Sequence, residues 1–521
     1  MPVGHVYLVG AGPGDPGLMT LRGLECLKKA DVVVYDRLAT PQLLREAKAG
    51  AEMVFAGKSP ERHALTQPEI NRLLVEKASQ GLVVTRLKGG DPFIFGRGGE
   101  EAEELVRAGI PFEVVPGISS TTAVPAYAGI PVTHRGLSSS LAIVTGHEEP
   151  GKRDSSLRWK ELATATDTLV FAMGMENLAH LSARLQENGR SPQTPVAVIQ
   201  WGTRPEQKTV VGTLADIAAV VQAAGLTSPA IIVVGEVVRL REVLNWYEKK
   251  PLFGRRMLVT RSREQASALR QRLEDLGATV FEFPVIKILP LSLWEDWERI
   301  RDKLQVARYR FVVFSSANGV KVFLEGLLAQ GQDARLLAGA SLVAIGPKTA
   351  EELRRYGLRA DLVPPEYRAE GLAAVLGKEL EGTRGEILLI RSNIGRDYLA
   401  GELTRYGHGV EELVVYRTEE NESGSEEIRR FLQEDGVDTV TFTSSSTVTN
   451  LLKLLGSGGK ELLQGIKVAC IGPVTADTAR ENGLPVAVVA KEYTIEGLVQ
   501  ALVQEATDSL RAADEAAVRN A

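Results

Sequence analysis

The chain has 521 residues, which is too long for one ordinary domain, so we expect roughly three or four domains. Hydrophobic residues make up 44% and charged residues 24%, a composition typical of globular proteins. The 61 Lys and Arg residues against 66 Asp and Glu residues give a net charge of −5, which argues against broad nucleic-acid binding because that requires a basic face.

Residues that form disulfides, metal sites or membrane segments are sparse. The two cysteines, Cys26 and Cys470, lie far apart with no C-x-x-C pattern, and the six histidines never pair at ligand spacing. No apolar run reaches membrane-spanning length, and no basic start followed by an apolar stretch opens the chain. We therefore expect no disulfide framework, no metal, no nucleic-acid or membrane partner, and a cytoplasmic location.

The chain opens with "VYLVGAGPGDPGLMT", a strand pattern that runs into a glycine turn and then a helix pattern. Against the dinucleotide fingerprint G-x-G-x-x-G, Gly10 and Gly12 fit but Asp15 stands where the third glycine belongs. Pro13 also removes a backbone donor that a pyrophosphate would use. Asp36, at the end of the next strand pattern, suits a ribose, so a nicotinamide oxidoreductase stays open beside a purely structural turn.

Short β-branched runs alternate with amphipathic helix patterns through the rest of the first half. Examples are "GLVVTRLKGG", "SLAIVTGH", "DTLVFAMG" and "PAIIVVGEVV", with helix patterns such as "EEAEELVRAG" between them. This alternation predicts α/β layers with mainly parallel sheets. The string "GGDPFIFGRGGEEAEEL" at 89–105 follows one strand and is far more specific than a lone glycine pair.

The polar stretch "NWYEKKPLFGRR", with Pro251 and Gly254, predicts a linker at 246–253, and an internal repeat follows it. "VAIGPKTAEELRRYGLRADLV" (343–363) matches "ACIGPVTADTARENGLPVAVV" (469–489), and "VFSSANGV" matches "TFTSSSTV". The repeat predicts two related α/β domains with matching strand-end loops, which are preferred ligand sites. The last residues, 504–521, are polar and rich in Ala and predict a frayed helix or a disordered tail.

The motifs of the first half, "VGAGPGDPGLMT", "YDRL", "GGDPFIFGRGGEEAEEL", "VPGISSTTAVPAYAGIPVTHRG" and "VFAMGMENL", resemble those of uroporphyrinogen-III C-methyltransferases, in the tetrapyrrole methylase family. The resemblance covers residues 1–245 and implies that family's two-domain α/β fold. It also implies S-adenosyl-L-methionine as cofactor and S-adenosyl-L-homocysteine as product. This cofactor carries no phosphate, so a loop with Pro13 and Asp15 suits it better than it suits a dinucleotide.

The resemblance places the cofactor site in six segments of the first half. The implied cofactor-binding residues are Pro13, Gly89, Gly90, Asp91, Ile94, Ser119, Ser120, Met173, Gly202, Pro229 and Ala230. Many relatives have Thr-Ala where this chain has Ser119 and Ser120. Considered alone, Met173 would be interpreted as a core methionine.

Two residues resemble the family's proton-handling groups: Asp36 as base and Lys58 as donor. The alternative for Asp36 is a turn cap or an ion pair with a helix. The substrate bears eight carboxylates, so arginines should line its binding site, and the candidates are Arg37, Arg97 and Arg135.

The second half, with "VTRS", "SSANGV", "IGPKTA", "IRSN", "VVYRT" and "SSSTV", resembles uroporphyrinogen-III synthase over residues 254–503. The resemblance implies a two-lobed fold of duplicated α/β domains and no cofactor. One lobe would comprise 254–288 and 419–503, and the other 289–418.

The second resemblance also implies site residues for ring closure. Tyr416 matches the tyrosine suspected of helping the substrate hydroxyl to leave, with a core tyrosine as the alternative. The implied substrate-binding residues are Arg261, Ser315, Ser316, Arg391, Ser444, Ser445 and Thr475. Helix N-capping is the alternative for these hydroxyls, and we expect it for at least half of them.

Together the resemblances imply a bifunctional enzyme of tetrapyrrole biosynthesis. It would cyclise hydroxymethylbilane to uroporphyrinogen III and methylate that product at C2 and C7 to give precorrin-2, which feeds sirohaem or cobalamin. A homodimer through the methyltransferase half is implied as well. Two alternatives stay open: methylation of another corrin precursor with a C-terminal binding or regulatory module, and a NAD-dependent oxidoreductase.

Overall fold

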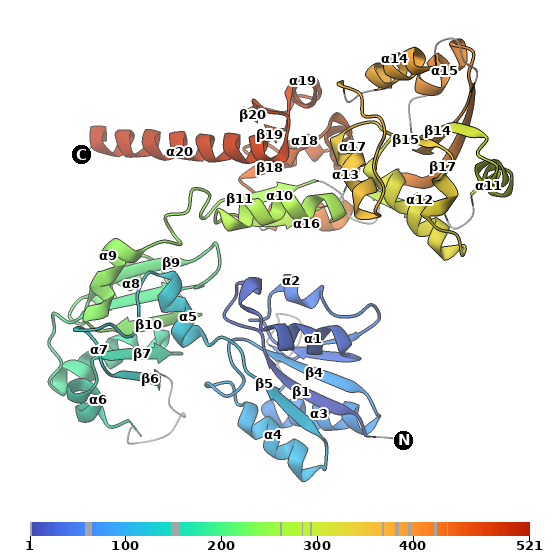
Figure 1. Ribbon diagram of the computed structural model, residues 1–521. Coiled ribbons are helices and arrows are strands. Elements are labelled where there is room, and N and C mark those ends of the chain that lie inside the picture. Colours follow the sequence, from blue (N-terminus) through green and yellow to red (C-terminus); the bar gives the residue numbers. More distant parts are fainter. Residues whose placement is uncertain are drawn as a thin grey trace. The chain divides into compact units, whose positions relative to one another are not determined.

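The computed structural model describes residues 3–57, 65–146, 157–260, 263–283, 285–291, 294–366, 369–380, 385–393, 398–420, 425–434 and 436–520. Met1–Met257 and Phe281–Ala501 form the bulk of two compact units. The described strands form four five-stranded sheets, two from the first half of the chain and two from the second, with helices between the strands (Figure 1). No described helix is long and apolar enough to cross a membrane.

The first sheet is parallel throughout and has the order β3-β2-β4-β1-β5. Its strands are β1 (His5–Gly10), β2 (Val32–Tyr35), β3 (Glu52–Phe55), β4 (Val83–Lys88) and β5 (Phe112–Val115). Its helices are α1 (Leu21–Lys29), α2 (Pro41–Leu44), α3 (Gln67–Ser79) and α4 (Gly98–Arg107). Helices α1 and α2 cover one face and α3 and α4 cover the other, which explains why its central strands are β-branched runs buried on both sides (Figure 1).

The second sheet is mixed, with the order β6-β7-β10-β8-β9. Its strands are β6 (Leu141–Thr145), β7 (Thr168–Ala172), β8 (Pro195–Gln200), β9 (Lys208–Thr213) and β10 (Ala230–Val234). Only β6 and β7 pair in parallel, and β10 and β8 pair antiparallel with their neighbours. Most pairs of this sheet are therefore antiparallel, in contrast to the predicted mainly parallel sheets. Strand β8 reaches β9 through a short turn rather than a crossover helix.

Helices pack on both faces of this second sheet. They are α5 (Ser120–Tyr127), α6 (Trp159–Ala165), α7 (Leu178–Glu187), α8 (Ile217–Ala223) and α9 (Arg241–Leu244). Helices α6, α7 and α8 share one core with the sheet, while α5 packs on the opposite face. Each fully buried Val, Leu or Ile in these cores contributes roughly 1.5–3 kcal/mol to the stability of the fold. This burial holds the helices and the sheet together, and with them the positions at which the strands end.

A third sheet of the order β12-β11-β18-β19-β20 uses strands from both ends of the second half. The strands are β11 (Arg256–Val259), β12 (Thr279–Glu282), β18 (Thr439–Phe442), β19 (Lys467–Cys470) and β20 (Val486–Val489). The helices are α10 (Arg263–Asp275), α16 (Ser425–Glu434), α17 (Ser445–Leu455), α18 (Gly459–Leu462), α19 (Pro473–Glu481) and α20 (Ile495–Asn520). The polar, Ala-rich residues after 503, for which the sequence predicts a frayed helix or a disordered tail, continue α20 as far as Asn520.

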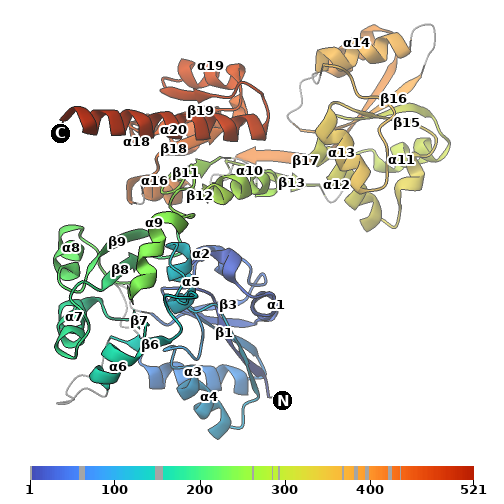
Figure 2. The ribbon, with the colours of Figure 1, turned by 60° about the vertical axis from the view of Figure 1, so that its left-hand side comes forward.

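The fourth sheet has the order β13-β17-β16-β14-β15, and only β13 is antiparallel to its neighbour. Its strands are β13 (Ile286–Pro290), β14 (Tyr309–Phe314), β15 (Ser341–Ala344), β16 (Glu386–Ser392) and β17 (Gly409–Glu420); β13 and β17 run alongside each other in the turned view of Figure 2. The helices are α11 (Trp297–Gln305), α12 (Ala317–Ala329), α13 (Pro347–Arg355), α14 (Ala369–Glu379) and α15 (Tyr398–Arg405).

The internal repeat has the same local structure in both copies. The strand pair β14 and β15 with helices α12 and α13 corresponds to β18 and β19 with helices α17 and α19. In each copy a serine-rich turn joins the first strand to its helix, and a Gly-Pro turn joins the second strand to its helix. These turns place hydroxyls and helix N-termini at the carboxyl ends of parallel strands.

Glycines allow the loops after β1, β4 and β5 to meet at backbone distance. Gly12 and Gly90 exchange backbone hydrogen bonds, with N–O distances of 3.2 and 2.7 Å. A Cβ on Gly10 would lie 2.5 Å from the Cα of Gly117 and 2.6 Å from the carbonyl oxygen of Gly90. Both atoms that a Cβ on Gly10 would meet belong to the backbone and cannot move aside, so position 10 requires glycine.

The substitution Gly10→Ala is expected to destabilise the first unit by at least about 1–3 kcal/mol, because its methyl group meets only backbone. The matched control is Gly99→Ala, since nothing lies within 4 Å of a Cβ there and Gly99 is in the first turn of α4. Differential scanning calorimetry of the full chain should show a lower unfolding temperature for Gly10→Ala and an unchanged unfolding temperature for Gly99→Ala. An unchanged Gly10→Ala transition would contradict this account of the loop contact.

Candidate active site

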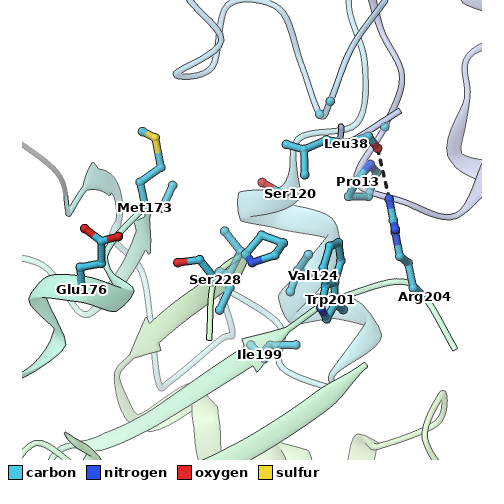
Figure 3. A pocket seen from close by; sticks show the side chains of 18 residues that line it. Pro13, Leu38, Ser120, Val124, Met173, Glu176, Ile199, Trp201, Arg204 and Ser228 are labelled. Carbon is cyan, nitrogen blue, oxygen red and sulfur yellow. Dashed lines mark hydrogen bonds between the residues drawn. The ribbon is translucent and has the colours of Figure 1, made fainter. Parts of the chain in front are cut away.

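A pocket of about 420 Å³ lies in the first unit, where the loops of the first sheet meet the strands of the second. We refer to it as the glycine-lined pocket. Its lining residues are Gly12, Pro13, Leu38, Gly89, Gly90, Ser120, Val124, Ala172, Met173, Glu176, Ile199, Trp201, Gly202, Arg204, Ser228, Pro229, Ala230 and Ile231 (Figure 3). A pocket of this size with few polar groups is typical of cofactor sites.

Most of the predicted cofactor residues line this pocket. They come from the loops after β1 and β4, the start of α5, the end of β7 and the segments next to β8 and β10, and they are Pro13, Gly89, Gly90, Ser120, Met173, Gly202, Pro229 and Ala230. The structure thus brings together residues that are far apart in the sequence. A Cβ on Gly202 would lie 2.3 Å from Cγ1 of Val124, so this glycine allows its loop to pack on α5.

The remaining predicted cofactor residues, Asp91, Ile94 and Ser119, shape the loops around the pocket. The Asp91 carboxylate accepts backbone N–H groups from Phe93 and Ile94 at 2.8 and 3.2 Å, and from Gly117 at 3.0 Å. Ser119 is the N-cap of α5, and Ile94 is an exposed side chain of the same loop as Asp91.

The glycine turn does not offer the donors that a dinucleotide requires. The backbone N–H groups of Gly12 and Gly90 are already donated to each other's carbonyl oxygens. Asp15 accepts the hydroxyl of Tyr127 at 2.7 Å, and its own N–H donates to Oγ1 of Thr203 at 3.1 Å. These bonds leave little capacity for a pyrophosphate, so the opening loop favours a cofactor without phosphate.

Two lining residues, Met173 and Trp201, and their neighbour Thr203 adopt the left-handed backbone conformation that residues with side chains rarely take. Met173, at the end of β7, has a φ of 55°, and Trp201, after β8, has a φ of 50°. Thr203, in the same loop as Trp201, has a φ of 69°. Such strain costs roughly 1–3 kcal/mol at each position and concentrates at binding and catalytic sites.

Sequence reasoning missed lining residues of two kinds. The strand and helix side chains, such as Val124 and Ile199, carry the same pattern as core residues, so no local signal separates them. Glu176 lies in the motif "VFAMGMENL", which carries the resemblance, and Trp201 and Arg204 lie within two residues of the predicted cofactor residue Gly202. Their nearness to these predicted positions was the available signal.

Asp36, the predicted base, lies directly after β2 and two residues before Leu38 in the pocket wall. One carboxylate oxygen accepts the N–H of Leu38 at 2.9 Å, and the other lies 3.8 Å from a guanidinium nitrogen of Arg86. The predicted turn cap is therefore present, and it fixes the direction of the carboxylate without excluding catalysis. Lys58, the predicted donor, lies outside the described residues.

A buried ion cluster lies behind the Asp36 turn. Glu101 is fully buried and accepts Lys88 at 2.7 Å and Arg86 at 3.2 Å on the same oxygen. Burial, followed by the positive charge of Arg86, lowers the pKa of Lys88. Because Lys88 precedes the loop and Glu101 lies in the first turn of α4, this ion pair ties together the two ends of the 89–97 loop.

The three predicted substrate arginines of the first half are exposed. Arg97 binds Glu100 through two hydrogen bonds of 2.8 and 2.7 Å, and these raise its pKa. Arg37 lies next to Asp36, and Arg135 lies in the turn between α5 and β6. None of the three lines the glycine-lined pocket.

In the second unit, the fourth sheet brings together several predicted synthase residues at its strand ends. The hydroxyl of Tyr416 lies 3.0 Å from Oγ of Ser316, the N-cap of α12, and the tyrosine side chain is 5% exposed. Ser315 donates to the carbonyl oxygen of Ile390 at 2.9 Å. Arg391 is buried and ion-paired with Glu412.

The other predicted synthase residues lie at the starts of the helices that follow β18 and β19 of the third sheet, except for Arg261, which is outside the described residues. Ser444 is the N-cap of α17, as predicted for several of these hydroxyls. Ser445 donates to the carbonyl oxygen of Val474 at 3.3 Å and accepts the hydroxyl of Thr478 at 2.8 Å. Thr475 is buried on α19.

Within the part of the chain that the structure describes, no group of three His, Cys, Asp or Glu side chains could hold a metal ion. Both cysteines are buried and unbonded to each other, and burial raises the pKa of Cys470 to about 11.

Comparison with known proteins matches each half of the chain to a protein family. Residues 5–218 match the family model described as tetrapyrrole (corrin/porphyrin) methylases, and residues 267–500 match the model described as uroporphyrinogen-III synthase HemD. A porphyrin biosynthesis protein HemD of Ruminiclostridium josui is 38% identical over 97% of this chain and 98% of its own length. A uroporphyrinogen-III C-methyltransferase of Priestia megaterium is 52% identical over 45% of this chain and 99% of its own length.

Among solved structures, a uroporphyrin-III C-methyl transferase of Thermus thermophilus complexed with S-adenyl homocysteine is 40% identical over 46% of this chain and 94% of its own, with a TM-score of 0.40. The full-length match and the two family models confirm the resemblances in both halves and exclude the nicotinamide alternative. The chain belongs to the tetrapyrrole methylases and joins an S-adenosyl-L-methionine-dependent uroporphyrinogen-III C-methyltransferase to a uroporphyrinogen-III synthase in one polypeptide.

Proposed function

We propose that this chain catalyses consecutive steps of tetrapyrrole biosynthesis: it closes hydroxymethylbilane to uroporphyrinogen III and methylates that product at C2 and C7 to give precorrin-2. The observation that carries the proposal is the glycine-lined pocket beside the Asp36 turn, in a chain whose two halves match the two enzyme families. Precorrin-2 is a precursor of sirohaem and cobalamin.

The residues of the glycine-lined pocket fit S-adenosyl-L-methionine. Gly89 and Gly90 present bare backbone at one wall, and Pro229, Ala230 and Ile231 form an apolar wall suited to an adenine ring. When bound, the cofactor supplies a methyl group activated by its sulfonium centre. The role of the chain is alignment, because a displacement reaction gains much of its rate from holding the acceptor carbon in line with that methyl group.

Asp36 is proposed as the acceptor of the proton that leaves the macrocycle after a pyrrole carbon has taken the methyl group. Its turn is fixed from several sides: the Leu38 N–H binds its carboxylate, and Arg86 approaches from the buried cluster. A carboxylate held in this way can accept a proton without reorganising. We propose Lys58 as the matching donor, on the resemblance alone.

Three exposed arginines of the first unit are proposed to bind the carboxylates of the macrocycle. Arg37 and Arg135 have no ion pair within the described residues, and their guanidinium groups are exposed. Arg97 would have to exchange Glu100 for a substrate carboxylate, which costs little at an exposed position.

For ring closure we propose that Tyr416 and Ser316 form the polar centre of the synthase site. The tyrosine hydroxyl can donate to the departing hydroxyl group of hydroxymethylbilane while Ser316 accepts or donates the second bond. Ser315, Ser444, Ser445 and Thr475 are proposed to bind substrate carboxylates. Arg391 can join them only by exchanging its partner Glu412, and Arg261 is proposed on the resemblance alone.

We also propose a cytoplasmic homodimer that associates through the first unit. Val243 and Leu244 of α9 and the neighbouring Trp246 expose 81%, 45% and 49% of their surface, which is an apolar patch available for burial. Light scattering of the purified chain should give about twice its mass of 56.3 kDa. A monomer at micromolar concentration would contradict this part of the proposal.

The proposed function is tested by a coupled assay with hydroxymethylbilane and S-adenosyl-L-methionine, in which precorrin-2 is detected by absorbance and mass. A parallel reaction starts from uroporphyrinogen III. Product from both starting materials is expected. Product only from uroporphyrinogen III would reduce the second unit to a binding module, and methylation of neither would point to another corrin precursor.

The substitution Asp36→Asn should lower kcat for methylation by about 10²- to 10⁴-fold, as expected for loss of a positioned proton acceptor. The affinity for S-adenosyl-L-homocysteine should stay within twofold, because the amide keeps the turn bond from Leu38. The control is Asp216→Asn, whose carboxylate accepts the Thr213 N–H in a similar turn away from the pocket. Full activity of Asp36→Asn would remove Asp36 from the mechanism.

The substitution Tyr416→Phe should slow uroporphyrinogen III formation by at least tenfold and leave methylation of supplied uroporphyrinogen III unchanged, since only the hydroxyl is lost. Tyr356→Phe serves as control, because that hydroxyl bonds Glu325 instead of a strand-end serine. Product analysis should separate the enzymatic isomer from the uninverted ring that forms spontaneously. Equal rates for both variants would show that Tyr416 is a core tyrosine.

A further inference from the structure

One charged side chain of the glycine-lined pocket has no part in the mechanism above. Arg204 follows β8 in the loop with Trp201 and Gly202, and its guanidinium group lies 5.0 Å from the centre of the Trp201 ring. In Figure 3, Arg204 and Trp201 lie on one side of the pocket, and Met173 and Glu176 lie on the other. The guanidinium group is therefore part of the pocket wall.

The hydrogen bonds of Arg204 leave most of its donors free. One terminal nitrogen donates to the carbonyl oxygen of Leu38 at 3.2 Å, and this bond is drawn in Figure 3. No Asp or Glu oxygen of the described residues lies within ion-pair distance of the group, and Glu206 acts on it only through its more distant charge. A guanidinium group has five N–H donors, so the single bond to Leu38 leaves others to bind a ligand.

The surroundings of Arg204 remove part of the water from its positive charge, which destabilises the charge unless an anion binds it. The side chain is half-buried, and burial lowers the pKa of its guanidinium group. Loop residues are shaped around it, since a Cβ on Gly14 would lie 2.8 Å from Cγ and Nε of Arg204. A fixed, partly desolvated cation that faces a ligand pocket is stabilised most by a bound anion.

We propose that Arg204 binds a carboxylate inside the glycine-lined pocket. Two ligands of this site carry one: the cofactor at its amino-acid end, and the acceptor on its acetate and propionate side chains. The Trp201 ring beside it and the Leu38 carbonyl restrain the guanidinium group, which can offer the two parallel hydrogen bonds that a carboxylate accepts. The inference rests on the methyltransferase assignment and adds a binding residue to it.

The test compares S-adenosyl-L-methionine with its decarboxylated form, which differs only by the carboxylate. Binding to the full-length chain is measured by titration calorimetry for the wild type, Arg204→Met and Arg204→Lys. If the carboxylate is that of the cofactor, Arg204→Met lowers the affinity for S-adenosyl-L-methionine by about tenfold or more, as for a lost charged hydrogen bond. Its affinity for the decarboxylated form stays unchanged. The affinity of Arg204→Lys for S-adenosyl-L-methionine lies between those of the wild type and Arg204→Met, because lysine keeps the charge but lacks the two parallel N–H donors.

If the carboxylate belongs to the acceptor, both cofactor affinities stay unchanged in Arg204→Met and the KM for uroporphyrinogen III rises about tenfold. The matched control is Arg184→Met, because Arg184 also stacks on a tryptophan, Trp159, and lies outside the pocket. It should bind both cofactor forms as the wild type does. Thermal unfolding of each variant checks that the first unit remains folded.

Two results would overturn the inference. The first is a variant Arg204→Met with unchanged affinities and unchanged KM. The second is an equal loss of affinity for both cofactor forms without a specific rise in KM, which would assign Arg204 to packing through Leu38 and Trp201. A wild-type chain that binds neither cofactor form would instead remove the proposed methyltransferase function and this inference together.

Discussion

The first unit depends on backbone-to-backbone contact between glycine loops. Gly12 and Gly90 exchange hydrogen bonds, and Gly10 and Gly117 approach so closely that no Cβ fits. These contacts bring the loops after β1, β4 and β5 together at the carboxyl edge of the parallel sheet, where the wall of the glycine-lined pocket forms. The same bonds use up the amide donors that a phosphate would need. A single constraint thus creates the pocket and restricts the kind of cofactor it accepts.

Polar bonds then join this wall to the second sheet of the unit. Asp15 connects to Thr203 and Tyr127, and Arg204 reaches the Leu38 carbonyl. The Asp36 turn is therefore held from its own sheet by Arg86 and, through Leu38, by the loop after β8. Because the two sheets contribute opposite walls, catalysis in this unit requires both to keep one geometry, and the left-handed residues of the 201–203 loop are part of that requirement.

Much of this site could be predicted from the sequence, for a specific reason. Gly90 has a positive φ and Gly202 has no room for a Cβ, so backbone geometry explains the residue type at these positions, whereas Met173 could be predicted only from its motif. Val124 and Ile199 could not be predicted, because an apolar side chain at a strand or helix position looks the same whether it faces a core or a ligand. Asp91 was predicted as a cofactor-binding residue, and in the structure its carboxylate stabilises the loop by accepting three backbone N–H groups.

The second unit shows why serine-rich motifs are harder to interpret. Ser316 and Ser444 are both N-caps at equivalent places of the repeat, so structure alone explains why a hydroxyl stands there. Only Ser316 lies within hydrogen-bond distance of a buried tyrosine hydroxyl. A cap needs one acceptor oxygen and leaves the hydroxyl proton free, so capping and catalysis are compatible in one residue. The duplicated fold supplied two such positions, and the difference between them lies in Tyr416 of β17, a strand whose length has no counterpart in the third sheet.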